Sequence, residues 1–230
     1  MCRYLPGFAK TFAMTFSLAC ALVFSAQTAC LARGTTKQTP TQLPRAVKPT
    51  HYTISIVPDA AHSRFTGQVS IALEVLQPTR NITLNAADLA IQSVQLSAVR
   101  DRVALTAQHI DLNADRQTAT FSFPAVLAKG SYILTIAYSG LIGSQANGLF
   151  HLDYDTVQGH QRALYTQFEN SDARRFVPSW DEPDYKASFA LQATVPAGQM
   201  AVSNMPVAGA TGLADGRKLV QFQTTPKMST

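Results

Sequence analysis

Two polar residues at the end of a predicted strand have side chains that could bind a cation. Gln167 and Glu169 alternate with Phe168, and neighbouring side chains of an extended chain point to opposite faces. The two polar side chains are therefore expected on one face, and a glutamate beside a cleft at a strand end can hold a positive charge. The residues taken by themselves favour a structural role for this pair over the binding role.

A charged segment with two prolines follows this pair directly. Pro178 and Pro183 bracket the tripeptide WDE at residues 180–182, and each proline restricts φ and so fixes the loop. The acids and arginines of the segment can form a compact ion-pair cluster that ties two sheets together. We interpret the segment as a structural brace made of Asp172, Arg174, Arg175, Trp180, Asp181 and Glu182.

The rest of the sequence shows no complete catalytic motif. The five histidines include no pair spaced i, i+4, and no H-E-x-x-H motif is present, so the residues predict no zinc site. His151 and His160 flank a predicted hairpin and are interpreted as surface turn residues. The chain also lacks the G-x-S-x-G, P-loop and G-x-G-x-x-G patterns, so it carries no self-sufficient catalytic apparatus.

Composition narrows the class of protein. The net charge of +5 comes largely from the first fifty residues, and no basic run follows, which argues against nucleic acid as a partner. All three cysteines, at positions 2, 20 and 30, lie in the first thirty residues. The chain after residue 30 therefore cannot form a disulfide or a thiolate metal site.

The first residues have the pattern of an export signal. A basic start with Arg3 and Lys10 precedes an uncharged apolar run over residues 11–26 and then small residues, which is typical of a cleaved signal peptide. We predict a signal peptide over residues 1–32, a polar flexible linker over 33–42, and a periplasmic or secreted protein without a stable membrane span after cleavage. An uncleaved anchor and a lipid at Cys30 are the alternatives.

From residue 43 onward the pattern is that of short strands. In the clearest of them, residues 65–75, apolar positions alternate with polar ones, so one face meets a core and the other meets water. Turn residues separate further candidates, and no helical period of four turns appears after residue 33. We predict an all-β, antiparallel sandwich-like or barrel-like domain, with strands near residues 52–57, 82–85, 91–96, 103–107, 118–123, 132–138, 148–152, 164–168, 187–195, 199–203 and 218–223.

The stretch YTQFENSDARRFVPSWDEPDYKASF, residues 165–189, resembles the amino-terminal domain of zinc aminopeptidases of the aminopeptidase N type, which are gluzincin metallopeptidases. Three further runs are similar to that domain: LP…PTHY within residues 43–52, VSNMP at 202–206 and TPKMST at 225–230. The resemblance covers residues 43–230. It departs from the family at Ser179, where the family often has a cysteine. A cysteine at that point is usually a small buried packing residue, so the change to serine does little to weaken the resemblance.

The resemblance implies a saddle-like β-sandwich that packs on a separate catalytic domain, which carries the zinc and the catalytic residues. It implies that Glu169 helps to bind the substrate's free α-ammonium group and that Gln167 lines the first specificity pocket. Peptide amino termini and the parent's own catalytic domain are then the partners. We expect this chain to be incomplete at its C-terminal end, to bind no catalytic zinc, to cleave no peptide, and to self-associate through open strand edges.

Two other functions are compatible with the sequence. One is a non-catalytic β-sandwich interaction module that retains the family pattern for structure only. The other is the family's epoxide-hydrolysing branch, and both the export signal and Glu169 favour an ordinary aminopeptidase over it. A downstream frame that encodes G-x-M-E-N and H-E-x-x-H would distinguish the enzyme from the module.

Overall fold

The computed structural model describes residues 42–100 and 104–230. The predicted signal peptide and nearly all of the predicted linker lie outside the described residues. Among the residues that are described, no helix has the length and apolar character needed to cross a membrane.

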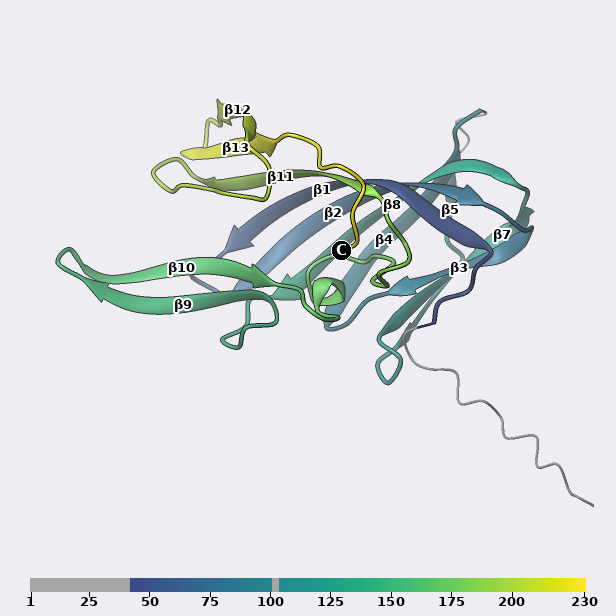
Figure 1. The fold of residues 1–230 in the computed structure, drawn as a ribbon, viewed down its shortest axis with the longest axis horizontal. Coiled ribbons are helices and arrows are strands. Elements are labelled where there is room, and N and C mark those ends of the chain that lie inside the picture. Colours follow the sequence, from purple (N-terminus) through teal and green to yellow (C-terminus); the bar gives the residue numbers. More distant parts are fainter. Residues whose placement is uncertain (1–41, 101–103) are drawn as a thin grey trace, which may run out of the picture. The chain divides into compact units, whose positions relative to one another are not determined.

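One large sheet organises the described chain (Figure 1). Its strand order is β12-β13-β11-β1-β2-β8-β4-β5, and every pair is antiparallel except β1 with β11. The crossover to a parallel β11 brings the end of the charged segment back beside the first strand. The strands are β1 (Val47–Asp59), β2 (Arg64–Val75), β4 (Leu89–Ala98), β5 (Ala104–Thr106), β8 (Gly130–Leu141), β11 (Ser188–Pro196), β12 (Val207–Gly212) and β13 (Arg217–Phe222).

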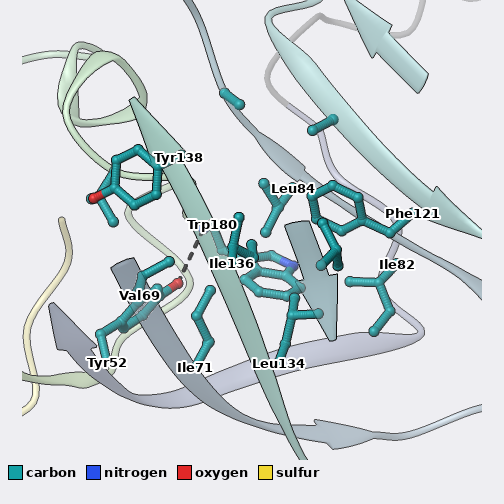
Figure 2. Packing of buried hydrophobic residues seen from close by; sticks show 14 of the residues in the cluster. Tyr52, Val69, Ile71, Ile82, Leu84, Phe121, Leu134, Ile136, Tyr138 and Trp180 are labelled. Atoms are coloured by element: carbon teal, nitrogen blue, oxygen red, sulfur yellow. Dashed lines mark hydrogen bonds between the residues drawn. The ribbon is translucent and has the colours of Figure 1, made fainter. Parts of the chain in front are cut away.

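A smaller sheet covers the large one. It has the order β3-β7-β6, with β3 (Thr79–Asn85), β6 (His109–Asn113) and β7 (Thr118–Leu127). Figure 2 shows Leu134 and Ile136 of the large sheet across from Leu84 and Phe121 of the small one, with the Trp180 indole between them. All five side chains are buried, so the predicted all-β sandwich is confirmed.

Two remaining elements carry the residues of interest. The strands β9 (Gly148–Thr156) and β10 (Gly159–Gln167) form a separate two-stranded hairpin (Figure 1). A single 3₁₀ turn, η1 (Ala173–Arg175), follows β10 and leads into the proline-bracketed loop. The loop then runs through an isolated bridge at Ala187 into β11.

The alternation predicted for residues 65–75 is present in β2, whose odd-numbered side chains from Phe65 to Val75 face the core. One glycine in β2 and one in β8 make room for an aromatic ring of the opposite strand. A Cβ on Gly67 would lie 2.5 Å from the ring of Tyr138, its partner across the sheet. A Cβ on Gly140 would lie 2.6 Å from the ring of Phe65, again its cross-strand partner. Glycine is required at both positions because each ring lies over the backbone.

The strand predicted over residues 199–203 is wrong. That segment is irregular, and Met200 and Val202 are 85% and 78% exposed, so the alternation there has no core to face. Instead β13 pairs with β11, and β12 adds outside β13. The strands β6 and β12 escaped the sequence analysis because both lie at sheet edges and bury none of their residues.

Candidate functional site

The hairpin presents Gln167 and Glu169 at the base of β10. Its register pairs Thr156 with Gly159 across a two-residue turn and ends with Gly148 opposite Gln167. The strand stops at Gln167, and Glu169 begins a turn. Both polar side chains are exposed, whereas Phe168 between them is half-buried. The peptide bond between Glu169 and Asn170 is cis.

The residues that follow β10 pack against its C-terminal end and hold it in place. The ring of Phe168 lies 5.3 Å from that of Phe176, centroid to centroid, and the Phe168 carbonyl accepts a hydrogen bond of 2.9 Å from the Asp172 N–H. Gly148 has φ +62°, and a Cβ there would lie 2.8 Å from the Cβ of Arg175. This left-handed conformation favours glycine, and the absence of a Cβ lets the first residue of β9 contact the turn after the tip. We refer to residues 167–169, which lie at the end of the hairpin opposite its turn, as the hairpin tip.

Arg174 and Asp181 form a buried ion pair behind the tip. Their side chains are 2% and 4% exposed, and Arg174 Nε donates to Asp181 Oδ2 at 2.8 Å. Arg174 Nη2 donates to the Asp181 carbonyl at 3.1 Å, and Nη1 donates to Gln117 Oε1 at 3.2 Å. The second carboxylate oxygen, Oδ1, accepts a hydrogen bond of 2.7 Å from Thr230 Oγ1. The pair is thus almost fully hydrogen-bonded, as a charge pair removed from water must be.

The other charged residues of the brace make separate contacts and do not join this pair in one cluster. Arg175 Nε donates to Asp172 Oδ1 at 2.9 Å, and Arg175 Nη1 bonds to Asp88. Glu182 turns toward the start of the described chain, where it accepts from the Leu43 N–H and lies 3.5 Å from Arg45 Nη2. The loop is therefore fixed to three other segments of the chain, through Gln117, Asp88 and residues 43–45.

The brace also ties the two sheets together through the backbone. Asn85 at the end of β3 exchanges two hydrogen bonds with Ser179, of 2.8 and 3.0 Å, and its side-chain Oδ1 accepts one from the Asp181 N–H at 3.1 Å. The backbone N–H of Trp180 donates a hydrogen bond of 3.1 Å to the Tyr52 hydroxyl of β1, which is the dashed line in Figure 2. Burial raises the pKa of Tyr52, so this hydroxyl stays neutral. The loop therefore contacts β3 through Asn85 and β1 through Tyr52.

The two hairpin histidines differ from each other. His160 is exposed and its Nδ1 lies 3.0 Å from Asp155, as expected for a residue near a turn. His151 is half-buried along β9, with a side chain that is 19% exposed, and is not a surface turn residue. Between them Arg162 bonds to both carboxylate oxygens of Asp153, which lowers the pKa of Asp153 to about 2.

Several partners of the brace carried no recognisable signal in the sequence. Asp88 and Gln117 come from short turns and have positive φ values of 57° and 52°. Asn85 ends a strand in which most residues are polar, so its position does not stand out in the sequence either.

A metal ion has no evident ligands in the part of the chain that the structure describes. No group of three or more His, Cys, Asp or Glu side chains in residues 42–100 and 104–230 is arranged to hold one. These residues therefore do not fit a zinc ion. The chemistry that they do offer is an exposed carboxylate and amide at the hairpin tip.

Comparison with known proteins matches nearly the whole described chain. The family model for the peptidase M1 N-terminal domain matches residues 48–230. Aminopeptidase N of Acetobacter pasteurianus is 43% identical over 190 residues, which are 82% of this chain and 52% of that protein. Aminopeptidase M1-D of Oryza sativa subsp. japonica and aminopeptidase M1 of Arabidopsis thaliana are each 34% identical, over 82% of this chain but 21% and 22% of their own lengths. The chain thus spans about half of the first relative and about a fifth of the plant proteins.

Proposed function

Because the chain belongs to the peptidase M1 N-terminal domain family, we propose that it is the substrate-anchoring domain of a longer, exported zinc aminopeptidase. The complete protein would remove amino acids from the free amino ends of peptides. Its relatives are aminopeptidases and extend well beyond the matched region, which supports this assignment. Since the described residues lack a metal-ligand cluster, zinc and the groups that cleave the peptide bond would come from elsewhere in the parent.

The exposed carboxylate at the hairpin tip is the observation that carries the proposal. A substrate's α-ammonium group that leaves water needs a carboxylate and hydrogen-bond partners in exchange. Glu169 is exposed and belongs to a tip held from behind by the Phe168–Phe176 packing. In the proposed role Glu169 binds the ammonium group and Gln167 contacts the first side chain. This contact makes a free amino end a requirement for binding.

Export is a second part of the proposal. The basic start, the apolar run and the small residues of the first 32 positions support a signal peptide, and the absence of cysteine after residue 30 is compatible with an exported domain held together by packing. The expected place of action is the periplasm or the medium. Fractionation of cells that express the parent, with and without residues 1–32, tests this part.

The carboxylate is tested by two matched substitutions in the complete parent protein. Glu169→Gln removes the charge and keeps the shape, and we expect kcat/KM for an aminoacyl anilide to fall about 10- to 100-fold, the equivalent of a charged hydrogen bond worth about 1.5–3 kcal/mol. Glu74→Gln makes the same change at an exposed salt bridge with Lys48 on β2, and should leave kcat/KM unchanged. Equal effects of the two substitutions would refute the proposed role of Glu169.

A further inference from the structure

The strand β10 has an open edge beside the hairpin tip. It pairs with β9 on one side, and no other strand of the described residues pairs with it. Across a two-residue turn the closing pair is hydrogen-bonded, so the odd-numbered residues of β10 direct their N–H and C=O groups toward β9. The even-numbered residues, including Leu164 and Thr166, direct theirs outward.

The opposite edge of the hairpin supports this assignment. The residues of β9 that should point outward are the odd-numbered ones, and Gly143 bonds to two of them. Its N–H donates to the Leu149 carbonyl at 2.9 Å, and its carbonyl accepts from the His151 N–H at 2.9 Å. In the described part of the chain, the backbone groups of Leu164 and Thr166 have no such partner.

Charge protects only the half of this edge that is remote from the tip. Arg162 is near the turn, and a charged side chain discourages the addition of another strand. Leu164 and Thr166 carry no charge, and Glu169 lies just beyond them. The unprotected half of the edge therefore ends at a carboxylate, a combination that is complementary to an extended chain with a positively charged amino end.

We propose that a peptide with a free amino end adds to β10 as a third, antiparallel strand, with its ammonium group at Glu169. This proposal rests on the function proposed above for Glu169. The antiparallel direction follows because the tip lies past the C-terminal end of β10, so a peptide that begins there must run back along the strand. Backbone hydrogen bonds then bind the residues behind the first one, as in other cases of strand addition.

The register determines which peptide groups are bound. With the first peptide residue opposite Gln167, the second and fourth are opposite Thr166 and Leu164 and exchange N–H···O=C bonds with them. The first, third and fifth side chains lie on the face that carries Tyr165 and Ala163. That face is apolar and open, since Leu152, Tyr154 and Tyr165 are 49%, 47% and 48% exposed. The site therefore favours peptides with apolar residues at the third and fifth positions.

Amide hydrogen exchange of the 230-residue chain tests the proposal residue by residue. The probe is a hexapeptide with leucine at its first, third and fifth positions and alanine between them. At ten times its Kd, exchange of the Leu164 and Thr166 amides should slow about tenfold. The Ala163 and Tyr165 amides, which already bond to β9, should change little. Uniform or absent changes across residues 163–166 overturn the proposal.

Modified peptides separate this proposal from the function on which it rests. N-methylation of the fourth peptide residue removes the donor to the Leu164 carbonyl and should weaken binding about tenfold. The N–H of the third peptide residue points away from β10, so its methylation should not weaken binding. Acetylation of the amino end, or Glu169→Gln, should weaken binding of every peptide. If only the amino-end changes matter, the strand addition is wrong and the anchoring role stands. If only the alternating backbone changes matter, the strand addition stands and the anchoring role is wrong.

Discussion

Two buried tyrosines of the same core give opposite predictions for the same substitution. Tyr52 and Tyr138 are both almost fully buried. The Tyr52 hydroxyl accepts a hydrogen bond of 3.1 Å from the backbone N–H of Trp180, whereas the Tyr138 hydroxyl has no hydrogen-bond partner among the described residues. Tyr52→Phe leaves a buried N–H unpaired and should lower the free energy of unfolding by about 1–3 kcal/mol. Tyr138→Phe removes a buried unpaired hydroxyl, so the free energy of unfolding should stay unchanged or rise by about 1 kcal/mol.

Urea unfolding of the two variants measures this difference at equilibrium. Tyr154→Phe, a substitution at an exposed hairpin residue, is the control and should stay within about 0.5 kcal/mol of the parent chain. If Tyr138→Phe destabilises the chain as much as Tyr52→Phe does, the hydroxyl of Tyr138 has a partner and the reasoning is refuted. A changed denaturant slope would instead indicate an altered unfolded state.

The same two residues predict an alkaline loss of stability. Burial raises the pKa of both hydroxyls above the usual value of about 10 for tyrosine. The native state keeps protons that the unfolded chain releases above about pH 10, so stability is complete below that pH and falls as the pH rises. Each tyrosine contributes about 1.4 kcal/mol per pH unit to the slope. Tyr138→Phe should therefore remove about half of the alkaline decline in the free energy of unfolding that the two tyrosines cause.

Three further predictions concern the brace, the large sheet and the hairpin. Asp181→Asn leaves the buried guanidinium of the brace unpaired and should cost about 3–5 kcal/mol in urea unfolding. Gly67→Ala should cost about 1–3 kcal/mol because the new methyl group meets the Tyr138 ring, whereas Gly212→Ala, with open space around it, should be neutral. The lowered pKa of Asp153 implies that its contribution to hairpin stability, present above about pH 4, is lost as the pH falls through about 2. Amide exchange of the hairpin against pH should show this loss, and Asp153→Asn should abolish it.

Strands that bury one face could be predicted from the sequence. In β2 the alternation of apolar and polar residues is set by the pleat, so the pattern determines which side chains face the core. The edge strands β6 and β12 have no fully buried residue, and Ile110 of β6 is half-buried against the core, so their side chains show no alternation that distinguishes them from loops. Residues 199–203 show the reverse, because the alternating pattern there has no core to face and leaves Met200 and Val202 exposed.

The hairpin tip could be predicted because its information is local. Gln167, Phe168 and Glu169 are consecutive, and the alternation at a strand end suffices to separate the exposed polar pair from the half-buried ring. The partners of the brace could not be predicted. Gln117 and Asn85 reach it from remote parts of the chain through single contacts, which leave no spacing or period in the sequence.

The central claim is that the carboxylate of Glu169 binds the substrate's ammonium group, and a double-mutant cycle tests it most directly. The inhibition constants of a peptide and of its des-amino analogue are measured on the complete parent protein and on its Glu169→Gln variant. We predict a coupling free energy of about 1.5–3 kcal/mol, because the amine matters only when the carboxylate is present. Additive effects, with a coupling near zero, would contradict the account.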